Sequence, residues 1–485
     1  MPTETVEMPI QELAKKQNTT TTMSPHNNIA ADVAELRHFF ASQVTKDIDF
    51  RLAQLKKLKA AIEKNEKAIV DALRADLHKH EFETFATELI LIYKELDDCI
   101  ANIRRWAQPR KVGTSMVFFK ASSYIISDPY GTVLIMGPWN YPFQLAILPL
   151  IGAIAAGNCV ALKPSEWAPH TAKVVTQIVA EALDPRQVKV FEGEMEVGQA
   201  LLAQKFDYIF FTGSTAVGRV VYEAAAKHLT PVTLELGGKS PCIVWKDADI
   251  STTVKRLMWG KLVNAGQTCI APDYLLVHPD IKDALIDGIK KTVKDFYGRN
   301  PAKSDYYCRI INDRHFNRLV SLMQQSGQIV FGGDTIAEER YIGPTLLDKV
   351  SPDSPIMQEE IFGPILPMID CASFDEAVRF INERPKPLAL YIFTRDKALS
   401  NRLFRETSSG TGGINHTLLQ IGNSNMSFGG VGESGVGGYH GEFSFNTFSH
   451  QKSIMDKSLM IETPLLYAPY RMSAKLLKFL AKKLG

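Results

Sequence analysis

One cysteine set among small and polar residues is the first feature of this sequence that could do chemistry. Cys269 ends the run Asn-Ala-Gly-Gln-Thr-Cys at 264–269, which leaves room beside its sulfur for a substrate carbonyl. A thiolate attacks carbonyl carbons readily, so Cys269 is a candidate nucleophile. The alternative is a small buried apolar residue, which is the commoner state of an isolated cysteine. No histidine stands in the motif to act as a base, which disfavours the chemistry of cysteine proteases.

Two further side chains could serve such a nucleophile. Glu235 stands between two leucines ahead of a Gly-Gly turn, and apolar surroundings raise the pKa of a carboxyl group, so it could take a proton near neutral pH. Asn140 lies in the proline-bounded run Pro-Trp-Asn-Tyr-Pro at 138–142, where a fixed amide could donate to a developing oxyanion. A strand-end glutamate paired with a surface lysine and an asparagine that caps a turn are the alternatives.

Two strand ends could hold a nucleotide. The run Phe-Thr-Gly-Ser-Thr-Ala-Val-Gly at 211–218 follows an apolar strand and precedes a helical pattern, so unpaired N–H groups of this turn could bind a phosphate. Lys163 and Glu166 follow another apolar strand and could grip a ribose through its hydroxyl groups. Taken alone, each pattern is equally compatible with an ordinary turn or a surface ion pair.

Taken together, six motifs in this order resemble the aldehyde dehydrogenase superfamily. They are PWNYP, LKPSE, FTGSTAVG, LELGGKSP, NAGQTC and EEIFGP, and the resemblance covers about residues 30–465. The separation of 34 residues between Glu235 and Cys269 also matches the spacing of base and nucleophile in that family. The short chain, the run VGESGVGGYHG from Val431 and the ending FNTFSHQKS at 445–453 resemble the class 3 branch, which includes fatty aldehyde dehydrogenases.

The resemblance implies a role for each motif residue. Cys269 is the expected nucleophile and Glu235 the expected general base, while Asn140 and the backbone N–H of Cys269 would form the oxyanion hole. The residues expected to bind the cofactor are Lys163, Glu166, Gly213, Ser214, Gly218, Glu360 and Phe362.

Within the cofactor set, the roles are distinct. The resemblance places Lys163 and Glu166 on the adenosine ribose and Ser214 on a phosphate. It places Glu360 on the nicotinamide ribose and Phe362 against the nicotinamide ring. A glutamate that caps a helix and a core phenylalanine are the alternatives for this last pair.

The function implied by the resemblance is NAD(P)-dependent oxidation of aldehydes to carboxylic acids, through a thiohemiacetal and a thioester on the cysteine. Medium- or long-chain aliphatic aldehydes are the expected substrates, with aromatic and polyene aldehydes such as apocarotenals left open. Glu166 would accept from a ribose 2′-hydroxyl and repel a 2′-phosphate, which favours NAD and leaves NADP as a second cofactor.

Two alternative functions remain. An acyl reductase would run the thioester chemistry backwards, and it would lack the water-activating base that Glu235 supplies. A catalytically silent binding protein would have lost the nucleophile or the base, and both are present. His416 and Ser427 depart from the class 3 pattern, in a loop expected near the substrate entrance.

The order of helical and strand-like patterns along the chain predicts the elements that must position these residues. Ala-, Leu-, Lys- and Glu-rich helical patterns come first, and from Tyr124 apolar strand-like runs alternate with helical stretches, which is typical of parallel sheets covered on both faces. We therefore expect an α/β protein of the aldehyde dehydrogenase type. Its expected parts are a disordered leader at 1–29, a Rossmann-type dinucleotide-binding domain at 30–109 and 130–236, an α/β catalytic domain at 237–440, a β oligomerisation extension at 110–129 and 441–458, and a C-terminal tail with an amphipathic helix at 459–485.

Composition limits the partners and the compartment. In 485 residues, 55 Lys and Arg balance 53 Asp and Glu to a net charge of +2, so no electrostatic footprint for nucleic acid is present. The six cysteines are sparse and fit no zinc pattern, so we expect free thiols, no metal site and a cytoplasmic location. Unpaired strands of the extension favour a homodimer. Leucines and lysines at helical spacing in 472–485 suggest either a packed helix or peripheral membrane contact.

Overall fold

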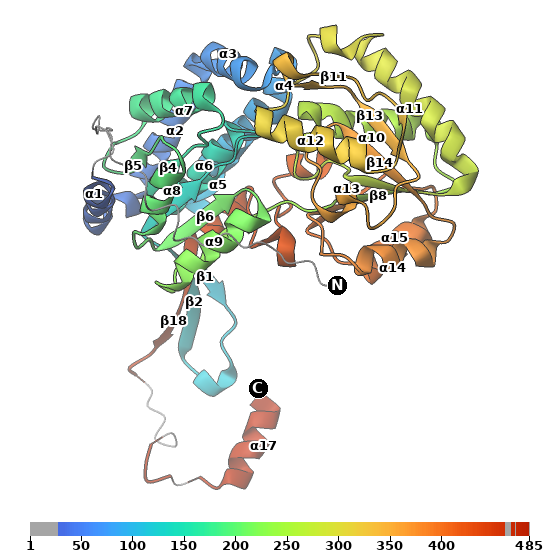
Figure 1. Ribbon diagram of the computed structural model, residues 1–485. Coiled ribbons are helices and arrows are strands. Elements are labelled where there is room, and N and C mark those ends of the chain that lie inside the picture. Colours follow the sequence, from blue (N-terminus) through green and yellow to red (C-terminus); the bar gives the residue numbers. More distant parts are fainter. Residues whose placement is uncertain (1–27, 461–466, 471, 485) are drawn as a thin grey trace, which may run out of the picture.

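The computed structural model describes residues 28–460, 467–470 and 472–484 of the chain. Two α/β units form the body of the molecule, and a narrow antiparallel sheet projects from it (Figure 1). The predicted leader falls almost wholly outside the described residues, which begin just ahead of the first helix, α1 (Ile29–Ala41).

The first unit is built on a six-stranded sheet with the order β17-β7-β6-β3-β4-β5. All neighbouring strands run parallel except β17, which pairs antiparallel with β7. The strands are β3 (Thr132–Met136), β4 (Cys159–Lys163), β5 (Val188–Val190), β6 (Tyr208–Thr212), β7 (Val232–Glu235) and β17 (Gly435–Val436).

Helices cover both faces of this sheet, because its central strands carry apolar side chains on both sides. Val133 and Ile135 face one layer of helices, whereas Leu134 between them packs with α1 on the other. On the first face lie α6 (Gln144–Ala156) and α7 (Pro169–Ala182), with α2 (Ile48–Lys64), α3 (Glu66–Leu77) and α5 (Ile90–Trp106) packed over them. On the second face lie α1, α8 (Met195–Leu202) and α9 (Thr215–Ala226).

The second unit contains a seven-stranded sheet with the order β10-β13-β14-β9-β8-β15-β16, parallel except for β10. Its strands are β8 (Pro241–Val244), β9 (Tyr274–Val277), β10 (Gln328–Phe331), β13 (Thr345–Asp348), β14 (Ile365–Asp370), β15 (Ala389–Phe393) and β16 (Thr411–Ile414). Its helices are α10 (Ile250–Leu262), α11 (Lys282–Tyr297), α12 (Asp313–Gln325), α13 (Pro355–Gln358), α14 (Phe374–Asn382) and α15 (Lys397–Glu406). A two-stranded ribbon, β11 (Thr335–Ile336) with β12 (Tyr341–Ile342), lies apart from this sheet.

The projecting arm is a three-stranded antiparallel sheet. Its middle strand, β2 (Ala121–Pro129), pairs with β1 (Arg110–Val112) and with β18 (Ser449–Lys457), which follows the short helix α16 (Glu442–Thr447). β1 and β18 are edge strands, and most of their residues are exposed. The last helix, α17 (Ala474–Leu484), lies beside the turn at the tip of this arm (Figure 1).

The α/β class with parallel sheets and a β extension is thus confirmed. The limits drawn between the domains stay a prediction, and β17 joins the first sheet although it lies within the segment 237–440 expected in the catalytic domain. In the described part of the chain, no helix has the length and apolar character that crossing a membrane requires.

Candidate active site

An apolar cavity of about 560 Å³ is lined by residues of both units. Glu235 at the end of β7 and Cys269 after α10 both line it, so the structure brings the predicted base and nucleophile into one cavity. Aromatic rings make up much of the remaining wall, and they are Phe82, Tyr141, Trp259, Phe296, Tyr297, Tyr306, Phe428 and Tyr439.

Glu235 is a buried carboxylate without a partner. Its backbone is held in the sheet between Thr212 of β6 and Gly435 of β17. Among the described residues, neither side-chain oxygen of Glu235 finds a hydrogen-bond partner, and only 2% of the residue is exposed. Burial raises the pKa of Glu235 well above its usual range, in the direction that its leucine neighbours predict. Such a carboxyl group binds a proton more tightly than an exposed one, which is the property that a general base needs.

The predicted nucleophile, Cys269, stands just after a strained turn. Asn264 and Ala265 have φ of 53° and 51°, and Gly266 follows with φ of 76°, so three successive residues adopt the left-handed region. This turn carries the chain from α10 to Cys269, whose thiol is partly exposed in the cavity. Burial raises the pKa of the Cys269 thiol, and the carboxyls of Glu360 and Glu235 raise it further. Formation of the thiolate therefore depends on a nearby base.

Asn140 lies against the segment that ends in Cys269. One N–H of its side chain donates to the backbone carbonyl of Gln267 at 3.1 Å, and the Asn264 amide donates to the backbone carbonyl of Asn140 at 2.7 Å. Asn140 is buried, with 3% of the residue exposed. A primary amide has a second N–H, which such a fixed side chain can present to an oxyanion.

The predicted adenosine and phosphate residues gather at the carboxyl ends of β4 and β6, strands that flank β3 in the sheet. The Lys163 ammonium lies 2.9 Å from the Glu166 carboxylate. Ser214 caps α9 by accepting from the backbone N–H of Val217, and Gly213 donates to the backbone carbonyl of Glu235 at 3.0 Å. The carboxyl edge of a parallel sheet next to a helix N-terminus is a common place for a dinucleotide.

Gly218 allows close packing in this unit, because a Cβ atom there would lie 2.6 Å from a methyl carbon of Leu236. It therefore fixes the distance between α9 and the segment after β7. This packing, rather than contact with a ligand, is what the geometry at Gly218 supports.

Glu360 and Phe362 approach the same sheet edge from the second unit. A Cβ atom at Gly237 would lie 2.1 Å from a Glu360 carboxylate oxygen, so that carboxylate rests directly on the backbone after β7. Burial, followed by the charge of Asp273, raises the pKa of Glu360 to about 8. The Phe362 ring meets Trp139 edge-on at 5.2 Å between centroids.

The described cavity wall contains the predicted base and the predicted nucleophile, and none of the residues predicted to bind the cofactor. Three polar wall residues, Glu83, Tyr141 and Thr268, were not singled out by the sequence, although two of them adjoin predicted motif residues. Of the two departures from the class 3 pattern, His416 packs against the cavity residue Trp259 at 5.7 Å between ring centroids. Ser427 directly precedes the cavity residue Phe428.

Comparison with known proteins identifies the class. The model of the aldehyde dehydrogenase family matches residues 12–454, and this chain belongs to that family. It is therefore an oxidoreductase that converts aldehydes to carboxylic acids with a nicotinamide dinucleotide.

Individual relatives indicate the branch of the family to which this chain is most similar. The 4,4'-diaponeurosporen-aldehyde dehydrogenase of Staphylococcus aureus is 49% identical over 93% of this chain and 99% of its own length. Aldehyde dehydrogenase family 3 member A2 of Pongo abelii is 48% identical over 90% of each chain. The mouse protein named aldehyde dehydrogenase, dimeric NADP-preferring, is 46% identical over 90% of this chain and 96% of its own. The resemblance to class 3 is confirmed.

A solved structure confirms the fold. The structure described as the substrate-bound state of Staphylococcus aureus AldH superposes with a TM-score of 0.91 at 48% identity. The match covers 93% of this chain and 99% of that one.

Proposed function

We propose that the cavity shared by Cys269 and Glu235 is the reaction chamber of an NAD(P)-dependent dehydrogenase for long apolar aldehydes. The observation that carries this proposal is that a buried carboxylate without a partner and a partly exposed thiol line the same apolar wall. Every buried polar group normally finds a partner, so an unpartnered carboxylate at this place points to chemistry.

The first step uses the sulfur. The Cys269 thiol loses its proton to the Glu235 carboxylate, which releases it to solvent before the second step. The sulfur electron pair forms a C–S bond to the aldehyde carbon while the carbonyl π pair moves onto oxygen. The Asn140 amide and the Cys269 backbone N–H are the proposed donors to that oxyanion, and one such donor contributes about 3–4 kcal/mol. The alkoxide then reforms its C=O bond as the C–H bond of the same carbon breaks, and the hydride would leave to the acceptor that the cofactor supplies, so that a thioester remains on Cys269.

The second step uses Glu235. Its carboxylate takes a proton from a water molecule as that oxygen attacks the thioester carbon. The C–S bond breaks, the carboxylic acid forms and the thiolate returns to Cys269. The raised pKa of Glu235 supports this assignment, because a carboxylate whose pKa is raised is a stronger base than an ordinary carboxylate.

The sheet edge beyond the cavity fits a dinucleotide. The Lys163–Glu166 pair at the end of β4 would hold the adenosine ribose, and the turn at Gly213 and Ser214 a phosphate. Glu360 would hold the nicotinamide ribose, with Phe362 against the ring. When bound, the cofactor supplies the acceptor for the hydride that leaves the substrate carbon.

NAD is the proposed primary cofactor. The Glu166 carboxylate lies at the strand end where it can accept from a 2′-hydroxyl and would repel a 2′-phosphate. Lys163 beside it offers a positive charge that allows NADP as a second cofactor, which is the one that the mouse relative is named as preferring.

The apolar, aromatic wall supports long aliphatic or polyene aldehydes as substrates. Burial of each methylene group contributes about 0.8 kcal/mol, so a long chain gains more in such a cavity than a short one. The polyene aldehyde in the name of the Staphylococcus relative favours the same class.

We propose a cytoplasmic homodimer that pairs through the arm. All six cysteines are free, which fits a reducing compartment. The exposed edges of β1 and β18 offer backbone groups to a second copy, and one relative is named as dimeric. Sedimentation equilibrium should give twice the 54.0 kDa of one chain.

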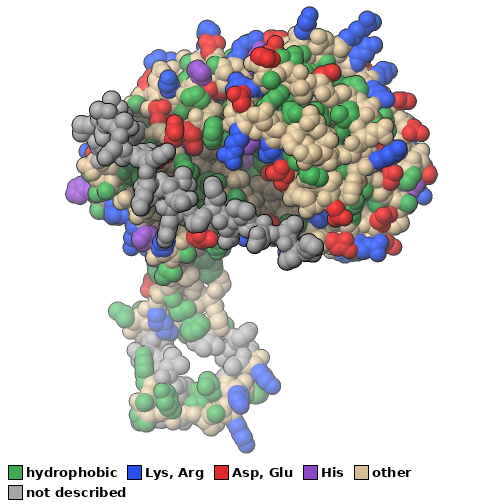
Figure 2. All heavy atoms as spheres, in the orientation of Figure 1, with side chains coloured by type: hydrophobic (Ala, Val, Ile, Leu, Met, Phe, Trp, Pro, Cys, Tyr) green, Lys and Arg blue, Asp and Glu red, His purple; other side chains and the backbone are tan. Residues whose placement is uncertain are grey.

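We also propose that α17 makes peripheral contact with membranes. Leu476, Leu477 and Phe479 are exposed on this helix together with Lys475 and Lys478, and apolar and basic side chains show on the segment below the arm in Figure 2. Basic amphipathic helices bind anionic membranes. The proposal fails if deleting residues 472–485 leaves binding to phosphatidylglycerol vesicles unchanged.

A substrate panel tests the proposed function. We expect Cys269→Ala to lose at least 10³-fold in steady-state formation of reduced cofactor, while cofactor binding is retained. With the wild-type protein, kcat/KM should rise along a series from short to long and polyene aldehydes, measured with NAD and with NADP. Full turnover by Cys269→Ala, or a preference for short aldehydes, would contradict the proposal.

A further inference from the structure

The turn that presents Cys269 is held from outside its own segment. Asn264 and Ala265 are not glycines, and a left-handed backbone costs a side-chain-bearing residue free energy unless its surroundings enforce it. The enforcing contact comes from α4 (Glu81–Thr84), which is 181 residues away in sequence. A Glu83 carboxylate oxygen accepts from the backbone N–H of Asn264 at 2.8 Å.

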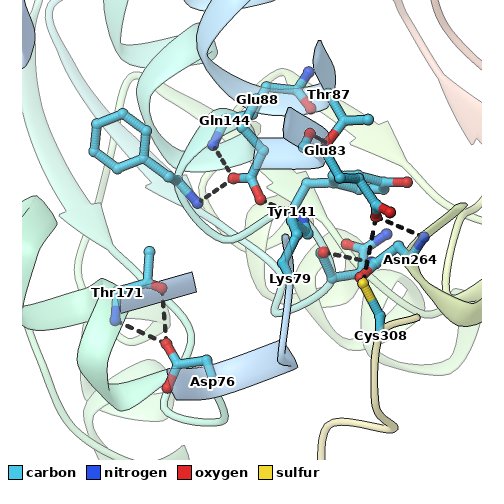
Figure 3. A network of polar contacts seen from close by, with 12 residues as sticks. Asp76, Lys79, Glu83, Thr87, Glu88, Tyr141, Gln144, Thr171, Asn264 and Cys308 are labelled. Atoms are coloured by element: carbon cyan, nitrogen blue, oxygen red, sulfur yellow. Dashed lines mark hydrogen bonds and ion pairs between the residues drawn. The ribbon is translucent and has the colours of Figure 1, made fainter. Parts of the chain in front are cut away.

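The fixed Asn264 in turn contacts the backbone of Asn140 and the segment that leads to Cys269. Its side-chain amide donates to the backbone carbonyl of Asn140 at 2.7 Å and to that of Gln267 at 3.2 Å. Asn264 is wholly buried, so these bonds are not shared with solvent. Figure 3 shows Glu83 and Asn264 together, with the Cys308 thiol donating to the same Glu83 oxygen at 3.4 Å.

We propose that Glu83 is a positioning residue, which sets the geometry of the nucleophile and of the oxyanion donor by anchoring Asn264. This inference rests on the proposed roles of Cys269 and Asn140. Glu83 acts through its hydrogen-bond acceptor and not through its charge or its proton, because what it receives is a backbone N–H at the head of the turn. A misplacement of reacting groups by about 1 Å can cost 10²-fold in rate, so loss of this anchor should appear in kcat.

A pair of substitutions at one position separates the acceptor from the charge. Glu83→Ala removes the acceptor, and we expect kcat to fall about 10- to 100-fold while KM for the aldehyde changes less than threefold. Glu83→Gln keeps an acceptor oxygen of the same reach, and we expect it to retain at least half of kcat with an unchanged pH profile. Cofactor binding, followed by fluorescence, establishes that each variant is folded.

The matched control is Glu81→Ala, because Glu81 lies on the same helix and is exposed. It should leave kcat and KM within twofold of wild type. Folded Glu83→Ala with wild-type kcat would overturn the proposal. Loss of activity by Glu83→Gln equal to that of Glu83→Ala, or loss of one limb of its pH profile, would also overturn it, since the charge or the proton would then be what matters.

Cys269→Ala is measured beside these variants to separate the two hypotheses. If Cys269→Ala keeps its activity, the proposed function fails. If Cys269→Ala loses activity and folded Glu83→Ala does not, the role of Glu83 alone fails.

Discussion

Two buried carboxylates of this fold, those of Glu88 and Glu235, differ in whether they have hydrogen-bond partners. Glu88, in the helical layer behind the cavity, forms an ion pair with Lys79, and both side chains are fully buried. Its other oxygen accepts from the backbone N–H groups of Phe143 and Gln144 at 3.0 Å each (Figure 3). Glu235, at the cavity wall, has no partner among the described residues.

This difference fits a structural role for Glu88 and the proposed chemical role for Glu235. A carboxylate whose oxygens are all engaged is held in one position, so it can support a backbone. The Glu88 cluster does this for the helix start at Phe143, while Lys79 lies 4.4 Å from the centre of the Tyr141 ring, whose hydroxyl bonds Thr268 beside Cys269. A carboxylate left unpartnered can change its ionisation state at little cost to its neighbours. Substitution of Glu235 and of the Glu88 pair tests this difference directly.

The largest effect is expected at the unpartnered carboxylate. Glu235→Gln removes the base, and we expect the rate of thioester hydrolysis to fall by about 10²–10⁴-fold while the fold is unaffected. Stopped-flow measurement should show a burst of reduced cofactor followed by slow turnover. A turnover rate after the burst equal to that of wild type would remove Glu235 from the role of base.

The paired carboxylate should respond in stability instead. Lys79→Met leaves Glu88 buried without its counter-ion, and breaking a buried pair in this way costs about 3–5 kcal/mol. The midpoint of urea unfolding, followed by tryptophan fluorescence, measures this loss. An unfolding midpoint equal to that of wild type would mean that the cluster does not hold the helical layer.

A smaller effect should appear when both partners are neutral. In Lys79→Met/Glu88→Gln no uncompensated charge remains, and the glutamine oxygen can still accept from Phe143 and Gln144. We expect the double variant to be about 1–3 kcal/mol more stable than the sum of the single losses predicts. Strict additivity in the same urea titrations would argue against a direct coupling.

The smallest expected effect is a pH slope. Because the pKa of Glu235 is raised above its usual 4.5 in the folded protein, the native state binds more protons than the unfolded state above that pH. The stability contributed by Glu235 is therefore complete at acid pH and declines as pH rises from about 4.5 through the raised pKa. Glu235→Gln removes this decline, so its Tm relative to wild type should increase from pH 5 to pH 8. Parallel Tm curves would contradict the unpartnered state.

The motif residues could be predicted because the chemistry of each is indicated by the residues next to it in the sequence. Glu235 lies between leucines after an apolar strand, and Cys269 ends a run of small polar residues, so each could be named from its neighbours. Parallel strands then bring such ends to one sheet edge, which is why Lys163 and Ser214 lie where a nucleotide-binding prediction needs them. The cofactor roles of Lys163 and Ser214 stay predictions, as do the catalytic roles of Glu235 and Cys269, which the substitutions of these two residues test.

The supporting residues could not be predicted, because their partners are distant in sequence. Lys79, Glu83 and Glu88 lie in a Lys- and Glu-rich helical stretch whose charges usually face solvent. The partners of the two glutamates come from distant segments, since Glu83 accepts from Asn264 and Glu88 accepts from Phe143 and Gln144. The cavity wall is equally non-local, since its aromatic rings come from segments as far apart as Phe82 and Tyr439.

The sheet of the arm can be completed only late in synthesis of the chain, because its strands are far apart in sequence. Its middle strand β2 is completed only by β18, and paired residues such as Ser127 and Gln451 are 324 positions apart. At a synthesis rate of about 5–20 residues per second, β2 waits roughly 15–60 s on the ribosome before β18 emerges. During that time a long strand edge is exposed to other nascent chains. The proposed pairing of two subunits through the arm would therefore follow release of the finished polypeptide, and truncation before residue 449 should yield aggregates.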